Sequence, residues 1–89
     1  MEFEWDAGKA RRNLAKHGVA FENTTEVFED ERSSTIEDPD ASELEARYLI
    51  FGRDRAGKYL VVCFVERDNR IRLISARKMT PSERSAYEE

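Results

Sequence analysis

Residues 47–78 read RYLIFGRDRAGKYLVVCFVERDNRIRLISARK and decide the fold class. Three apolar runs, residues 48–51, 59–65 and 71–76, are rich in aliphatic and aromatic side chains and are separated by compact polar turns. Such runs are typical of strands, and turns that contain Asp, Asn and Gly are typical of hairpins. The stretch therefore predicts three consecutive antiparallel strands.

The residues before this stretch predict a short strand followed by a helix. Residues 3–5 are typical of a strand, and Asp6 stands where a capping residue is expected. Ala7, Ala10 and Leu14 recur on one helical stripe, and Gly18 is typical of the residue that ends a helix. A first helix is expected between Asp6 and Gly18.

Three more elements complete the predicted fold. Asn23 and Glu26 are spaced like a capping box, which predicts a short second helix, and residues 33–37 predict a brief strand before a turn at 38–40. Thr80, Pro81 and Glu83 occupy the positions that a helix start favours, so a last helix is expected to about residue 87. Residues 1–89 are expected to form one α+β domain with an antiparallel sheet, two amino-terminal helices and one carboxyl-terminal helix.

Length and composition narrow the class of protein. With 89 residues, 39% of them hydrophobic, the chain is too short for a deep cofactor cleft, which favours a surface site. Its longest apolar stretch, residues 59–65, is far shorter than the ~20 residues of a membrane helix, and no signal-peptide pattern precedes the first strand. We expect a cytoplasmic protein without a membrane segment.

Charge is distributed unevenly along the chain. Residues 1–45 hold five Lys/Arg against thirteen Asp/Glu, a net charge of −8, whereas residues 46–89 hold ten against six, a net charge of +4. An overall charge of −4 therefore does not exclude nucleic acid binding by the second half.

The last predicted strand carries arginines whose faces follow from alternation. A regular strand places Ile71, Leu73 and Ser75 on one face and Arg72, Ile74 and Ala76 on the other, with Arg77 at its exit. Arg67 leaves the preceding strand at the turn, so its distance from Arg77 does not follow from pairing alone. Arg84 and Tyr87, one helical turn apart, are expected to approach Arg77 from the side.

These arginines suit RNA cleavage by the 2′-hydroxyl. That reaction needs a base, a donor that stabilises the phosphorane and an acid for the 5′-oxygen. Arginine supplies the donor but is a poor proton carrier, so base and acid remain open among His17, Glu66, Tyr87 and Lys9. His17 also stands at a helix end, where a cation complements the helix dipole, and that structural role is favoured.

Other basic residues are candidate RNA contacts, and metal binding has little support. Arg53, Arg55 and Lys58 lie in one predicted turn, where a solvated hairpin tip is an equal alternative. One His, one Cys and acids without ligand spacing predict neither a metal site nor a cofactor. Cys63 lies in the most apolar run, so core packing and a raised pKa are expected rather than nucleophilic catalysis.

Two groups of residues form separate signatures at the ends of the chain. The first comprises Phe3, Glu4, Trp5, Asp6, Lys9, Asn13, Lys16, His17, Gly18, Val19, Phe21 and Glu22, and the second comprises Ile71, Arg72, Leu73, Ile74, Ser75, Ala76, Arg77, Glu83, Arg84, Tyr87 and Glu88. Together they resemble the BrnT family of bacterial toxins over nearly the whole chain.

The resemblance implies a RelE-like fold and a metal-independent endoribonuclease that inhibits translation and growth. It also implies neutralisation by a BrnA-type antitoxin with a ribbon-helix-helix part, in a heterotetramer that reaches operator DNA only through the antitoxin. The functional arginines would be Arg67 and Arg77, which we expect to hold the scissile phosphate together, and the product would be a 2′,3′-cyclic phosphate. The supporting residues would be Glu66, Tyr87, His17, Lys9 and Arg84. Apart from the resemblance, Arg72 on the last strand is a further candidate RNA contact.

Two other functions stay open from the sequence. One is a non-enzymatic binding module for nucleic acid or protein, and the other is a degenerate toxin that acts as an operon co-repressor. Charge asymmetry further suggests that a basic antitoxin segment crosses the acidic stretch that contains Glu43 and Glu45.

Overall fold

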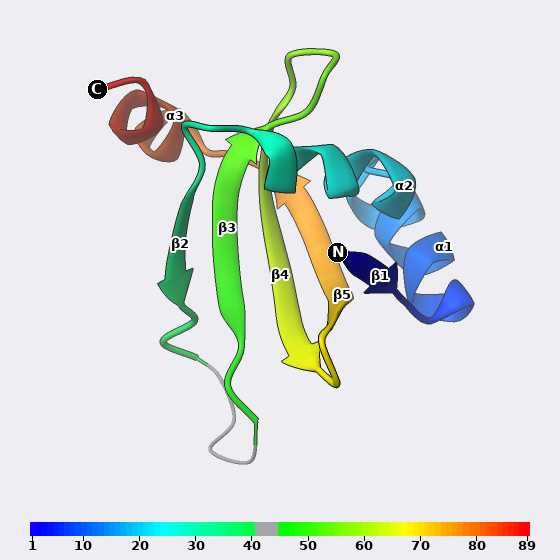
Figure 1. Cartoon of the computed structure of the whole chain (residues 1–89). Helices are drawn as coiled ribbons and strands as arrows, with labels where there is room; N and C mark the ends of the chain where they lie inside the picture. The colour runs from blue at the N-terminus through cyan, green and yellow to red at the C-terminus, as the bar shows by residue number, and fades with distance from the viewer. Residues whose placement is uncertain (41–44) are drawn as a thin grey trace.

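The computed structural model describes residues 1–40 and 45–89 and contains one five-stranded sheet with three α-helices (Figure 1). The elements in chain order are β1 (Glu2–Glu4), α1 (Ala7–His17), α2 (Phe21–Thr24), the 3₁₀ helix η1 (Thr25–Glu29), β2 (Ser34–Glu37), β3 (Tyr48–Arg53), β4 (Tyr59–Arg67), β5 (Arg70–Lys78) and α3 (Pro81–Glu88). The predicted α+β class is confirmed.

The sheet has the strand order β1-β5-β4-β3-β2. Strands β3 to β5 form the predicted antiparallel meander, each extending beyond its predicted run, and β2 pairs antiparallel with β3. Strand β1 instead pairs parallel with β5, with Phe3 opposite Ile71, so the sheet is mixed rather than purely antiparallel. This pairing joins the two ends of the chain.

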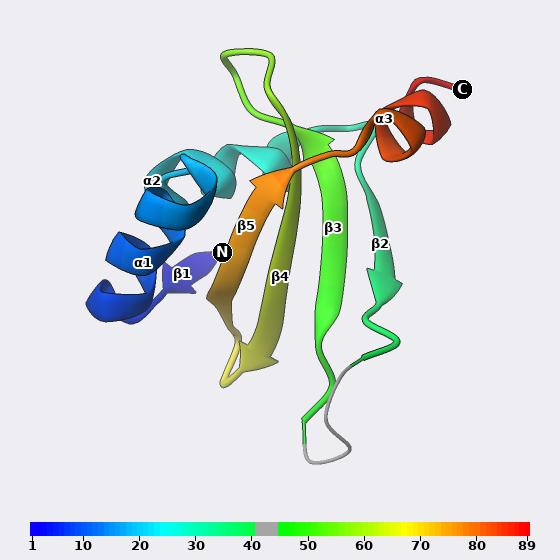
Figure 2. The same cartoon turned by 180° about the vertical axis from the view of Figure 1, so that it is seen from behind.

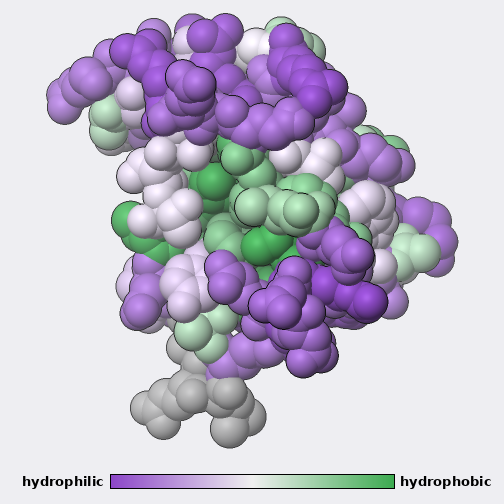
Figure 3. Space-filling model, viewed as in Figure 1, coloured by the Kyte–Doolittle hydropathy of each residue, from purple (hydrophilic) through white to green (hydrophobic). Residues whose placement is uncertain are grey.

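One face of the sheet is covered by α2 and η1 and holds the core, while α1 lies beside the β5 edge (Figures 1 and 2). The buried cluster comprises Val19, Phe21, Val27, Ile50, Leu60, Val62, Phe64, Ile71, Leu73 and Ala76. Phe28 lies between Phe3 and Phe64 in edge-to-face contacts with ring centroids 5.1 and 5.0 Å apart. Figure 3 shows apolar side chains gathered in the middle of this side, surrounded by hydrophilic ones.

Helix α1 begins and ends as predicted, but its buried face is different. The Asp6 carboxylate accepts a hydrogen bond from the Lys9 backbone, and Gly18 ends the helix with φ 69°. Leu14, expected to face the core, is 52% exposed, whereas Asn13 is buried. The Asn13 amide donates to the Val19 carbonyl (3.0 Å) and accepts from the Ala76 amide (2.9 Å). A polar residue therefore joins α1 to the part of β5 that β1 leaves unpaired.

The capping box predicted at Asn23 and Glu26 is wrong. Helix α2 begins after Ala20 without a side-chain cap, and the following turn is a 3₁₀ helix. The hydroxyls of Thr24 and Thr25 donate to carbonyls three residues earlier, which tightens this turn.

The alternation predicted along the last strand is also wrong beyond Leu73. Cys63 pairs with Ser75 and Phe64 pairs with Leu73, so Ile74 is an extra residue that forms a β-bulge. The bulge reverses the faces of the following residues, because Ala76 now joins the core and Ser75 points away from it. It also brings Arg77 onto the face that carries Arg72.

The turn between β4 and β5 and the start of α3 have the local geometry that the sequence predicts. Asp68 and Asn69 adopt positive φ values of 50° and 65°, as a tight hairpin turn requires. Thr80 and Glu83 form a complete capping box with Pro81 in the first turn, as predicted. In the described ranges, no helix is long and apolar enough to cross a membrane.

Candidate RNA-cleavage site

The face of the sheet opposite α2 and η1, here called the open face, carries a row of arginines. It is made of the side chains of Leu49, Phe51, Val61, Cys63, Val65, Arg67, Arg70, Arg72, Ser75 and Arg77. No helix lies along these strands in Figure 2, and α3 lies at one end beside β2 and β3. The open face is therefore apolar in the middle and basic toward its ends.

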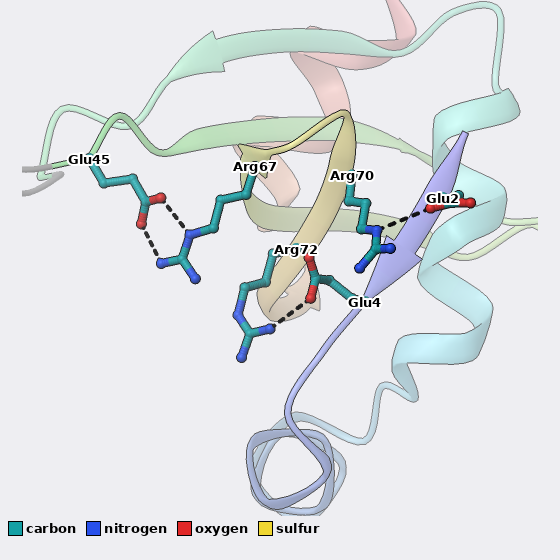
Figure 4. Close-up of polar contacts among 6 residues, drawn as sticks. All are labelled: Glu2, Glu4, Glu45, Arg67, Arg70 and Arg72. Atoms are coloured by element: carbon teal, nitrogen blue, oxygen red, sulfur yellow. Dashed lines mark hydrogen bonds and ion pairs between the residues drawn. The ribbon is translucent and has the colours of Figure 1, made fainter.

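One end of the open face holds the hairpin cluster, which is Arg67, Arg70 and Arg72 with Glu45, Glu2 and Glu4 (Figure 4). Arg67 donates two hydrogen bonds to Glu45 (2.6 and 2.7 Å), whereas Arg70 and Arg72 each donate to a β1 glutamate at 3.1 Å. The Arg67 hydrogen bonds hold the pKa of Glu45 below its usual value. Such exposed pairs stabilise little, so a phosphate can replace the carboxylates at small cost.

The other end holds the α3 cluster, made of Arg77, Glu83, Tyr87, Asp30 and Tyr59 with Arg53 and Arg84. Arg77 donates to both carboxylate oxygens of Glu83, at 2.7 and 2.9 Å. These hydrogen bonds lower the pKa of Glu83 to about 2. A guanidinium has five N–H groups. Here Nη1 donates to Glu83 and to the Lys78 carbonyl, and Nη2 donates to Glu83. Within the described part of the chain, Nε–H and one Nη2–H remain unpaired, and this fork matches a phosphate.

Tyr87 links α3 to the segment before β2. Its hydroxyl donates to the Asp30 carboxylate, which also accepts from the Arg53 backbone at 2.9 Å. Burial and this hydrogen bond raise the pKa of Tyr87 to about 12, so the hydroxyl stays protonated at neutral pH. Burial opposes ionisation of Asp30, but the hydrogen bonds from Tyr87 and the backbone outweigh it and lower its pKa.

Tyr59 stands beside Tyr87 between two arginines. The Arg84 guanidinium lies 3.9 Å from the Tyr59 ring centroid and that of Arg53 lies 5.0 Å away, while the Tyr87 ring meets it edge-on at 5.7 Å. Cation–π contacts of this kind fix arginine side chains without neutralising them. Arg84 also pairs with Glu88 at 3.2 Å, whereas no ion pair involves Arg53 among the described residues.

A cleft of about 390 Å³ opens next to the α3 cluster. It is lined by the apolar side chains of Ile36, Phe51, Ala86 and Tyr87 together with Arg32, Ser34, Ser82 and Glu83. The cleft thus joins apolar side chains to Glu83, the residue that pairs with Arg77.

Arg67 and Arg77 do not come together as expected from the sequence. Arg77 pairs with Val61, and Arg67 lies six residues farther along β4. At about 3.3 Å per residue, the two backbone positions are about 20 Å apart. The two arginines point from the same face but belong to opposite ends of the sheet, so the prediction that they hold one phosphate together is wrong.

The structure places the other predicted residues in four separate regions. Glu66 pairs with Ile71 and points to the side of the sheet opposite Arg67. Lys9 and His17 lie on α1. Arg55 and Lys58 lie in the β3–β4 turn, where Arg55 pairs with Glu29 at 2.6 Å. Arg53, Arg84 and Tyr87 alone join Arg77.

The sequence did not single out Asp30, Arg32 or Tyr59 as functional. Asp30 lies in an acidic stretch and reads as a surface residue, because its contact with Tyr87 spans 57 residues. Tyr59 reads as a strand residue, although its neighbours in space are arginines.

The structure also bears on a metal site and on the role of Cys63. Residues 1–40 and 45–89 contain no group of three His, Cys, Asp or Glu side chains that could hold a metal ion. Cys63 is buried on the open face, and burial followed by the Asp38 charge raises its pKa, as predicted.

Comparisons with known proteins agree on one family. The family model described as "Ribonuclease toxin, BrnT, of type II toxin-antitoxin system" matches residues 5–83. The crystal structure of the Brucella abortus ribonuclease toxin BrnT superposes with a TM-score of 0.67 at 23% identity, covering 90% of this chain and 97% of that chain. That likeness establishes the shared fold. No curated protein matches this chain. The chain therefore belongs to the BrnT family of ribonuclease toxins of type II toxin–antitoxin systems.

Proposed function

We propose that this protein is an endoribonuclease that cleaves RNA by 2′-hydroxyl transesterification, without a metal ion, at the α3 cluster. The observation that carries the proposal is the Arg77 side chain, which Glu83 holds in place while its Nε/Nη2 fork remains unpaired among the described residues. The family supports ribonuclease activity, and the open face supports binding of an extended strand.

In this mechanism the 2′-oxygen forms a bond to phosphorus and the bond from phosphorus to the 5′-oxygen breaks. One proton leaves the 2′-hydroxyl and one reaches the 5′-oxygen, which yields a 2′,3′-cyclic phosphate and a 5′-hydroxyl. Arg77 stabilises the charge on the phosphorane, an interaction worth about 2 to 4 kcal/mol when such donors are removed. His17 and Glu66 lie away from the α3 cluster, so water exchanges the protons.

The remaining residues take supporting roles in this proposal. Tyr87, protonated at neutral pH, orients Asp30 and closes one side of the cleft rather than acting as a base. Arg53 and Arg84 hold the phosphates next to the scissile one. Arg72 and Arg67, about 13 and about 20 Å from Arg77 along the strands, hold phosphates farther along the RNA.

Controlled induction of single variants tests the proposed function. Wild-type protein is expected to arrest growth and translation and to create new RNA ends with 2′,3′-cyclic phosphates, whereas Arg77→Ala is expected to cleave about 10²- to 10³-fold more slowly. Arg11→Ala is the matched control, because it removes one exposed arginine from α1, outside the α3 cluster. Equal toxicity of wild type and Arg77→Ala would sink the assignment of this site.

A modified substrate and a chelator test the proposed reaction mechanism. RNA with a 2′-deoxy nucleotide at the scissile position is expected to remain intact, because it lacks the attacking group. Chelation of divalent ions is expected to leave cleavage of ordinary RNA unchanged. Loss of cleavage on chelation would replace the metal-independent mechanism with a metal-assisted one. Intact RNA at every dose of wild-type protein would favour the non-enzymatic co-repressor instead.

The partner in this proposal is a BrnA-type antitoxin with a ribbon-helix-helix part, acting in the cytoplasm. Membership of a type II family supports an antitoxin partner. We propose a heterotetramer in which the antitoxin alone contacts operator DNA, and mass measurement of the co-purified complex tests it. The acidic stretch expected to meet a basic antitoxin segment contains Glu43 and Glu45. Glu43 lies outside the described residues. Glu45 pairs with Arg67, so a charge reversal at Glu45 would also free that arginine.

A further inference from the structure

Helix α1 carries a basic groove that the cleavage site does not use. The groove has a volume of about 380 Å³ and lies between α1 and the bulged part of β5. It is lined by Lys9, Arg12, Asn13, Lys16, His17, Ile74 and Ser75. Four of these seven residues are basic, and their positions at i, i+3, i+7 and i+8 place them along one side of the helix.

The charge of this helix is unusual for the part of the chain in which it lies. Residues 1–45 have a net charge of −8, yet residues 7–17 contain four Lys/Arg and no acid. Basic residues near the last turn complement the helix dipole, which explains Lys16 and His17. The dipole disfavours a cation such as Lys9 in the first turn, and it has little effect on Arg12 beyond that turn, so it explains neither residue.

The basic residues of the groove differ from most open-face arginines because they form no ion pairs among the described residues. Four arginines of the open face are each paired with a glutamate, namely Arg67, Arg70, Arg72 and Arg77, whereas no ion pair involves Arg53 among the described residues. As far as the structure describes the chain, no ion pair involves Lys9, Arg12, Lys16 or His17. Asp6 faces this region, but its carboxylate caps the helix and only weakens the field around Arg12. The groove is thus a positive surface that no carboxylate has to leave before an anion binds.

The groove is continuous with the open face. Ser75 pairs with Cys63 and therefore points to the open face, and the same residue lines the groove. The bulge at Ile74 produces this connection, because it turns Ser75 and Arg77 to one side of β5. Figure 2 shows α1 beside the β5 edge on that side. A strand that leaves the α3 cluster across β5 would meet α1 next.

We propose that the α1 groove is a second phosphate-binding site, which holds the RNA backbone outside the cleavage site. The inference rests on the proposed function for the identity of the polyanion. Lys9, Arg12 and Lys16 contact phosphates through charge, which gives affinity without sequence preference. Asn13 takes no part, because both ends of its amide are occupied within the fold.

Binding of a 2′-O-methyl RNA oligonucleotide at several salt concentrations tests the groove. This RNA cannot undergo 2′-hydroxyl attack, so the assay reports binding alone. The triple variant Lys9→Gln/Arg12→Gln/Lys16→Gln is expected to reduce the slope of log K against log salt by about 2, since each phosphate contact contributes roughly 0.7. Arg12→Gln alone should reduce it by about 0.7, whereas Arg11→Gln, on the same helix outside the groove, should change it little.

Cleavage of ordinary RNA at saturating concentration separates this inference from the proposed function. The triple variant is expected to keep the wild-type rate at saturation and lose only affinity, and unchanged circular dichroism serves as its folding control. An unchanged salt slope in the triple variant would overturn the inference, as would an equal effect of Arg11→Gln. A triple variant that binds RNA normally but loses its antitoxin would assign the groove to a protein partner instead. Wild-type protein that binds the oligonucleotide without cleaving RNA would count against the proposed function and leave the groove standing.

Discussion

The Arg77–Glu83 pair makes a pH-dependent contribution to stability that can be worked out from the structure. Glu83 ionises at about pH 2 in the folded protein against an ordinary value of 4.5. The difference corresponds to about 3 kcal/mol at 1.36 kcal/mol per pKa unit. The Glu83 side chain is 25% exposed and that of Arg77 is 40% exposed, so solvent screening reduces the expected contribution to about 1–2 kcal/mol.

Glu83→Gln isolates this charge, because glutamine can still accept the Thr80 amide hydrogen bond of the capping box. The folded pKa is lowered, so the stabilisation is present above the unfolded pKa and is lost as pH falls from about 4.5 to about 2. At pH 7 the variant should lose about 1–2 kcal/mol of unfolding free energy. Below pH 2 both proteins carry a neutral side chain, so the difference should disappear.

Urea unfolding between pH 2 and pH 7 measures this difference. Glu88→Gln is the matched control, because it removes one charge from the same helix where Glu88 and Arg84 are both about half exposed. It should cost less than Glu83→Gln. The reasoning is refuted by equal losses in the two variants at pH 7, or by a Glu83→Gln variant with the wild-type pH dependence below pH 4.5.

Three other substitutions test the packing that supports the site. Phe21→Ala empties a fully buried position and should cost about 3–5 kcal/mol in urea unfolding; a loss below 1 kcal/mol would contradict the assigned core. Asn13→Asp removes the donor to the Val19 carbonyl and should cost about 1–3 kcal/mol at pH 7, with partial recovery in acid, where the carboxyl regains its proton. Gly52→Ala places a Cβ 2.8 Å from Val27 Cγ1 and should lower stability by about 1–3 kcal/mol, and an unchanged melting temperature would show that this contact yields freely.

Much of the fold followed from signals that act over a few residues. The Asp68–Asn69 turn, the Asp6 and Gly18 ends of α1, and the Thr80 capping box all occur where the sequence predicted them. Each depends on local backbone hydrogen bonds or on the φ values that a residue tolerates. The predicted capping box at Asn23 failed because α2 begins after Ala20, which places Asn23 inside the helix rather than at its cap position.

The candidate site depended on distances that no local signal reports. The contact of Tyr87 with Asp30 and the pairing of β1 with β5 join residues 57 or more positions apart. Arg67 and Arg77 were predicted to meet, yet the antiparallel register places them at opposite ends of the sheet. Composition alone does not tell whether two arginines lie close together or about 20 Å apart.

By itself the sequence determined the class of fold, the order of its elements, the basic character of its second half and the family resemblance. Only the tertiary structure decided which arginines share a face and which groups gather around Arg77. The physical reason is that side chains alternate along a strand with period two, so one extra residue reverses every face after it. Ile74 is that residue, and its bulge places Arg77 on the open face.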